Sequence, residues 1–182
     1  MAYTYPHTIE NSIGEKIIFI KEEKGSSGDK VFFEGFCNPG CGPTFHTHLL
    51  QDEELTVVSG TMGYQYFGQE PKYLKAGETV LLKKGSTHKF WAEKEHLHLK
   101  CWVSPANSFV FFMTVLYAAQ NKSGKGQPET FDGAYLTTKY RSEYDIPEIP
   151  SFIKKTIIPL TYFIGRVLGK YKNLIDAPTP IR

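Results

Sequence analysis

Three histidines and one glutamate lie close together in the sequence, at spacings that suit metal binding. His46 and His48 are two residues apart, so both rings project from one face if this stretch is a strand. Glu53 follows a short turn at the start of the next apolar stretch, and His88 follows a turn at Gly85. Three imidazoles and one carboxylate suit one divalent transition metal, such as Fe, Mn, Ni, Cu or Zn. Four protein ligands leave two positions of an octahedron for water or substrate, so such a site can do chemistry.

Glycines frame these residues in two motifs. The first reads G-x5-H-x-H-x4-E-x6-G from Gly40 to Gly60, and the second reads G-x7-G-x2-H from Gly77 to His88. They resemble the two motifs of the cupin superfamily, the germin-type double-stranded β-helix, and the first motif is matched in full. The second motif departs from the family pattern in two places that are not among the ligand candidates. These are Lys83, where proline is usual, and Ala92, where asparagine is usual.

The resemblance covers about residues 31–104 and implies a metal-dependent protein with a small-molecule substrate. By similarity to small dioxygenases of the superfamily, we expect an oxidoreductase in which Glu53 is both a ligand and a catalytic base. Two alternatives stay open. One is a non-redox metal-dependent cupin of the isomerase or decarboxylase type, and the other is a cupin that binds a small molecule without catalysis.

Four further side chains are candidates for a substrate pocket. Met62, Tyr64 and Tyr66 alternate along one predicted strand, and Phe90 lies two residues after His88. In a cupin these faces point into the barrel, so the four side chains either line a pocket or pack in the core.

Short alternating segments separated by turns predict the elements that would position this cluster. They are residues 16–20, 31–36, 55–58, 62–66, 79–82 and 96–103. The chain contains 13 Phe, 11 Tyr, 16 Gly and 11 Pro, which favours a turn-rich β protein. The predicted fold is therefore mostly β, a double-stranded β-helix (cupin jelly-roll barrel) with one or two C-terminal helices.

We expect a single domain in three parts. Residues 1–30 form an N-terminal strand extension, residues 31–104 the cupin barrel core, and residues 105–182 a helical extension packed on the barrel. Apolar residues at helical spacing predict helices over 108–120 and 151–172, the second kinked at Pro159.

The segment 151–172 is basic as well as amphipathic, with five cations and no acidic residue. Such a helix can make peripheral contact with an anionic membrane. The alternative, which we favour, is that its apolar side packs on the barrel or on a second subunit.

Composition excludes several classes of function. The net charge of +2 and the absence of a basic stripe argue against nucleic-acid binding, and no run of 18 apolar residues predicts a transmembrane segment. Three cysteines cannot all pair, and the N-terminal residues do not resemble a secretory signal, so we expect a cytoplasmic protein. By resemblance to cupins of this size, we also expect a homodimer.

Overall fold

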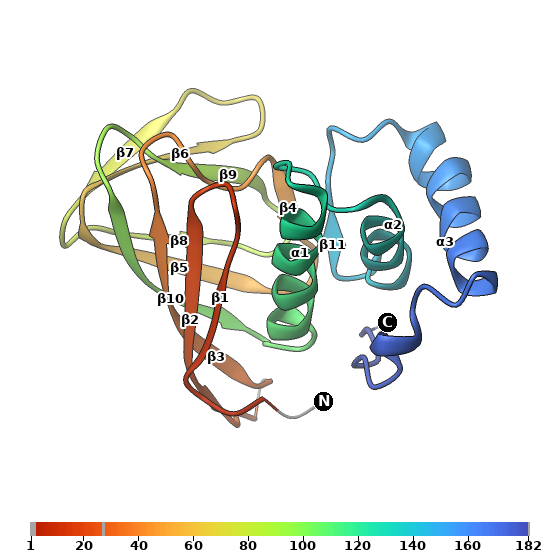
Figure 1. Ribbon diagram of the computed structural model, residues 1–182. Coiled ribbons are helices and arrows are strands. Elements are labelled where there is room, and N and C mark those ends of the chain that lie inside the picture. Colours follow the sequence, from red (N-terminus) through yellow and green to blue (C-terminus); the bar gives the residue numbers. More distant parts are fainter. Residues whose placement is uncertain (1–2, 27, 182) are drawn as a thin grey trace.

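The computed structural model describes residues 3–26 and 28–181, which form two antiparallel sheets and three α-helices, all three after β10 in the chain (Figure 1). The first sheet has the order β1-β2-β3-β10-β5-β8, and the second has the order β11-β4-β9-β6-β7. The strands of the first sheet are His7–Glu10, Glu15–Glu23, Lys30–Cys37, Leu97–Ser104, Asp52–Ser59 and Thr79–Leu82, in that spatial order. Those of the second are Tyr144–Asp145, His46–His48, Thr87–Ala92, Thr61–Tyr66 and Lys72–Lys75. This arrangement confirms the predicted fold class, and each predicted strand lies within or largely overlaps an observed one.

The main core lies between the two sheets. Residues of β3 and β5 alternate between buried and partly exposed positions, as expected for strands with one face on a core. Phe19, Leu55 and Met62 are among its fully buried side chains. All three cysteines are free thiols, and Cys101 on β10 is buried in this core.

Two glycines let neighbouring parts of the backbone come very close together. Gly60 ends the first motif, and Gly42 lies in the loop before β4. Gly60 joins β5 to β6 with a φ of +86°, and a Cβ there would lie 2.5 Å from the carbonyl oxygen of His96. A Cβ at Gly42 would lie 2.1 Å from the carbonyl oxygen of Phe90. The loop that leads into β4 therefore lies directly against β9, and only glycine permits this contact.

Helix α1 (Phe109–Ser123) packs on the first sheet, as predicted, with the Phe109 ring 5.4 Å from that of Phe33. Helix α2 (Thr130–Lys139) was not predicted, because Gly133 and its threonines leave only a weak apolar pattern. Its first turn is held by the carboxylate of Glu129, which accepts from the backbone N–H groups of Phe131 and Asp132. A second, smaller core forms between the two helices from Phe111, Tyr135, Leu136 and Tyr140.

The terminal helix is shorter than predicted. A π-helical turn, Ile153–Ile157, leads directly into α3 (Ile158–Val167), and this turn is the irregularity that accompanies Pro159. The helix ends before Gly169, which has a φ of +68° and supplies a left-handed C-terminal turn. A short 3₁₀ turn, Lys172–Leu174, follows.

The packing of α3 also corrects an expectation. Its apolar side does not pack on the barrel: α3 lies against α2, on the far side of the helices from the sheets (Figure 1), and most of its apolar side chains are exposed. Packing on a second subunit stays a prediction. No helix in the described part of the chain is long and apolar enough to cross a membrane.

Replacing Gly60 tests the close contact between its backbone and the carbonyl oxygen of His96. Gly60→Ala should destabilise the protein by about 3 kcal/mol or more, because it adds a backbone clash to the cost of a positive φ. Gly77→Ala is the matched control. Gly77 also has a positive φ, of +89°, but a Cβ added there would meet no other atom within 4 Å. That variant should lose only about 1–2 kcal/mol in urea unfolding. Equal losses for the two variants would contradict the clash.

Candidate metal centre

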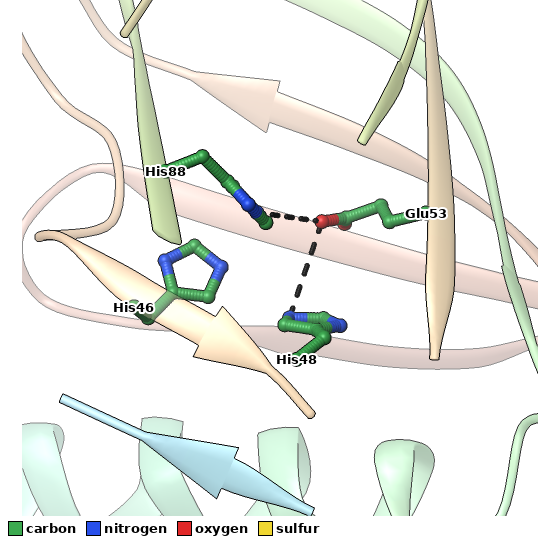
Figure 2. A group of neighbouring side chains, drawn as sticks. All are labelled: His46, His48, Glu53 and His88. Carbon is green, nitrogen blue, oxygen red and sulfur yellow. Dashed lines mark ion pairs between the residues drawn. The ribbon is translucent and has the colours of Figure 1, made fainter. Parts of the chain in front are cut away.

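Strands of both sheets bring the four predicted ligands together (Figure 2). His46 on β4 pairs in register with His88 on β9, so their rings project from the same face with centroids 4.5 Å apart. His48 lies two residues further along β4, and Glu53 reaches toward the cluster from β5 of the opposite sheet. One candidate ligand atom from each residue lies within 4.8 Å of every other.

Backbone carbonyls fix which ring nitrogen carries a proton in two of the histidines. The Nδ1 atom of His46 lies 2.9 Å from the carbonyl oxygen of Thr44, and that of His88 lies 2.9 Å from the carbonyl oxygen of Ser86. A carbonyl oxygen only accepts hydrogen bonds, so each Nδ1 must carry the proton. In the neutral rings, Nε2 is then left with a free lone pair. This is the usual arrangement of histidines that bind a metal through Nε2.

A carboxylate oxygen of Glu53 and a ring nitrogen of His88 point toward each other in the cluster. The Oε2 atom of Glu53 lies 3.5 Å from Nε2 of His88 and 4.0 Å from Nε2 of His48. Both Oε2 of Glu53 and Nε2 of His88 are buried and lack a hydrogen-bond partner, as does Nδ1 of His48. Unpartnered buried polar atoms are costly, and a cation between them removes the cost. The residues therefore fit a divalent metal.

The electrostatics of the cluster favour a bound cation. Burial alone would raise the pKa of Glu53, but the neighbouring imidazoles outweigh it and bring that pKa down to about 2. Burial lowers the pKa of His48, and burial together with the charges of His48 and His88 lowers the pKa of His46, although its ring stays partly accessible. At neutral pH the carboxylate is ionised while these two imidazoles are neutral, so their lone pairs are free to bind a cation.

The predicted pocket residues lie on the same face as the cluster. Sheet register places Tyr66 beside His88, Tyr64 beside Phe90 and Met62 beside Ala92. Tyr66 and Phe90 are partly buried, whereas Met62 is fully buried in the core. Tyr66 is thus the predicted pocket residue placed directly next to a candidate ligand, and a role for all four in lining a pocket stays a prediction.

The two departures from the second motif are accommodated locally. The Nζ atom of Lys83 lies 3.3 Å from Oδ2 of Asp52, whose Oδ1 accepts from the backbone N–H of Lys84 at 2.9 Å. These contacts fasten the turn before β9 to the residue preceding Glu53. Ala92 is fully buried, and its backbone N–H donates to the carbonyl of Cys41 at 2.9 Å.

Two residues near the cluster were missed by sequence reasoning. Tyr144 on β11 pairs in register with His48, and its ring stands perpendicular to that imidazole with centroids 5.5 Å apart. Phe109 of α1 lies 5.9 Å from the same imidazole. The C-terminal extension thus forms one wall of the site. No spacing signal could have identified it, because these residues are far from the histidines in the sequence.

The preceding residue, Glu143, ties this wall together. Its carboxylate is fully buried and accepts hydrogen bonds from Nε2 of Gln51 at 2.9 Å and from Oγ of Ser108 at 2.8 Å. Gln51 belongs to the turn between His48 and Glu53, and Ser108 precedes α1, whose N-terminus favours a negative charge. Glu143 also accepts from the backbone N–H of Ile181 at 3.1 Å. It is placed to position the ligands rather than to bind a metal.

Glu143→Ala should therefore destabilise the protein by about 3 kcal/mol, because it leaves the buried donors of Gln51 and Ser108 unpaired. Urea unfolding of the metal-free protein measures this loss. Glu70→Ala is the control, since Glu70 is exposed in the turn between β6 and β7 and should change stability by less than about 0.5 kcal/mol. A loss below about 1 kcal/mol for Glu143→Ala would show that the network contributes little.

Comparison with known proteins gives one sequence relative. A stretch of 67 residues is 33% identical to the oxidoreductase IacF of the fungus Pestalotiopsis fici, covering 35% of this chain and 33% of that protein. The chain thus spans about a third of the length of the curated relative it matches. No family model matches the sequence.

Solved structures place the fold. KdgF from a Halomonas species matches with a TM-score of 0.50 and 17% identity, over 57% of this chain and 92% of that one. An RmlC-like cupin from Shewanella frigidimarina matches with a TM-score of 0.50 and 17% identity, over 58% of this chain and 89% of that one. Together with the two sheets described above, these matches show that the chain has the double-stranded β-helix fold of the cupin superfamily.

Proposed function

We propose that this protein binds one divalent transition metal through His46, His48, Glu53 and His88 and acts as an oxygenase on a small organic substrate. The observation that carries the proposal is the convergence of candidate ligand atoms without a hydrogen-bond partner, above all Glu53 Oε2 and His88 Nε2 at 3.5 Å, in a buried place. A divalent metal held there supplies Lewis acidity and, if it is iron, manganese, nickel or copper, redox chemistry.

The residues of the chain have separable roles in this proposal. Glu53 provides the negative charge, and its pKa of about 2 makes it a poor proton acceptor, so the position is better suited to a ligand than to the expected base. His46 is the one ligand candidate that stays partly accessible, so we infer that substrate approaches from its side. Tyr66 lies next to His88, and burial raises its pKa, so its phenol stays protonated and can donate a hydrogen bond to substrate.

One observation favours an oxygenase over non-redox chemistry. The relative IacF is named an oxidoreductase, and three imidazoles with one carboxylate are compatible with a redox-active ion as well as with zinc. The aromatic side chains beside the ligands, Tyr64, Tyr66 and Phe90, suit a planar or apolar substrate.

The ligand assignment is tested by removing one imidazole at a time. His46→Ala and His88→Ala should each abolish stoichiometric metal binding, measured by elemental analysis after dialysis against the metal. Each should also lose the stabilisation that metal gives the wild type, about 3 kcal/mol at a hundredfold excess over Kd, or roughly 5–10 °C in Tm.

The matched control for these variants is His98→Ala. His98 stacks on Phe36 with centroids 4.4 Å apart and pairs with Glu34, away from the cluster. Its replacement should leave metal content unchanged. Full metal occupancy in both ligand variants would refute the site.

The oxygenase assignment is tested by metal identity and oxygen consumption. Protein purified without chelator should contain about one equivalent of iron, manganese, nickel or copper. A screen of phenolic and diketone compounds with an oxygen electrode should then find consumption that needs this metal and is lost in His88→Ala. One equivalent of zinc without oxygen consumption would overturn the oxygenase assignment while keeping the metal site.

A further inference from the structure

The outer side of α3 carries an apolar stripe that no part of the described chain covers. Leu160, Phe163, Ile164 and Val167 follow the spacing i, i+3, i+4, i+7, so they lie on one face of the helix. Leu160 is 57% exposed, Phe163 61% and Val167 71%. Phe152 and Leu168 extend the exposed apolar surface at the two ends of the helix. Exposed apolar side chains gathered in one continuous patch mark an interaction site more often than scattered ones do.

Packing on the opposite side of the helix fixes this orientation. Gly165 is buried where a Cβ would lie 2.3 Å from Oη of Tyr171 and 2.9 Å from the ring of Phe131. The ring of Tyr162 stacks on that of Tyr171 with centroids 5.3 Å apart and lies 6.1 Å from that of Tyr135. The aromatic side of the helix therefore packs against the protein, and the side chains of the stripe are exposed. The helix itself lies at the edge of the molecule (Figure 1).

The surroundings of the stripe are positively charged. No acidic residue occurs between positions 149 and 175, and residues 151–172 carry five cations, which leaves −3 for the rest of the chain. Lys154 pairs with Asp145 at 2.6 Å. The remaining four are Lys155, Arg166, Lys170 and Lys172, and no ion pair to them is found among the described residues.

We propose that the stripe and its cations dock this protein on an anionic membrane surface, with α3 lying in the plane of the interface. The apolar side chains would enter the boundary between headgroups and acyl chains, and the cations would contact the headgroups. From Ser151 to Val167 the helical segment is about 25 Å long at 1.5 Å per residue, and it lies along the protein edge rather than across a bilayer.

Charge argues against a second copy of the chain as the occupant. A two-fold contact through the stripe would bring the cations of both copies together with no acidic residue in either segment to oppose them. An anionic lipid surface supplies the opposite charge that the segment lacks. This docking does not depend on the identity of the metal or on the reaction at the barrel site.

Vesicle co-sedimentation of the full chain tests the proposal. The protein should bind vesicles of phosphatidylcholine and phosphatidylserine mixed at about two to one, bind pure phosphatidylcholine at least about tenfold less, and be released as salt is raised. The triple variant Leu160→Ser/Phe163→Ser/Val167→Ser should bind at least about tenfold less than the wild type. Lys155→Gln/Arg166→Gln should weaken binding to the anionic vesicles and flatten its salt dependence.

Phe67→Ser is the matched control, because Phe67 is also exposed, at 59%, but lies in the turn between β6 and β7. It should bind as the wild type does. Circular dichroism melting of the triple variant should match the wild type, since the replaced side chains are exposed. No binding of the wild type to the anionic vesicles at low salt, or equal binding by the triple variant, would overturn the proposal. A dimer that the triple variant converts to a monomer, seen by light scattering, would assign the stripe to a second copy instead.

Discussion

The buried carboxylate of Glu53 and the Nε2 atom of His88 face each other at 3.5 Å, and the surrounding structure holds them there. The carbonyl oxygen of Ser86 accepts a hydrogen bond from Nδ1–H of His88, so the ring cannot flip to point this N–H at Glu53 without losing that hydrogen bond. The first sheet carries the carboxylate and the second carries the imidazole, so the packing of the two sheets sets the gap. Buried polar atoms without a hydrogen-bond partner are costly in the interior, and a cation bound between these two would remove that cost.

Several layers of hydrogen bonding keep the cluster in register. The backbone N–H of Gly85 donates to the carbonyl of His48 at 2.7 Å, which links the turn before β9 to the end of β4. Asp52 binds the same turn through Lys83 and Lys84, so the lysine that replaces the usual proline takes part in fixing it. Preorganisation of this kind lets a site bind its ion without paying to rearrange the ligands.

Six of the eleven strands in the described part of the chain, and the metal-ligand candidates, were predictable because their signals are local. The remaining strands (β1, β4, β7, β9 and β11) were not among the predicted segments, and β7 and β11 show no alternation of burial. The spacing from His46 to Glu53 fits a single strand and turn. The wall formed by Tyr144 and Glu143 was not predictable, because the bond from Gln51 to Glu143 joins residues 92 positions apart. The apolar periodicity of α3 was recognised, but periodicity does not say which side of a helix faces the protein. In this protein the close contact between Gly165 and Tyr171 determines which side of α3 faces the protein.

The hydrogen bond from the backbone N–H of Ile181 to Glu143 ties the candidate site to a distant part of the chain. All four candidate ligands lie at or before position 88 in the sequence, whereas the residues that brace their turn lie near position 143 and the tail that holds those residues lies at positions 178–181. Tyr140 donates to the carbonyl of Pro178 at 2.9 Å, so the tail also clamps the end of α2. Because a chain is made from its N-terminus, the imidazoles are made first, and the hydrogen bonds of Pro178 and Ile181 can form only after those residues have been added.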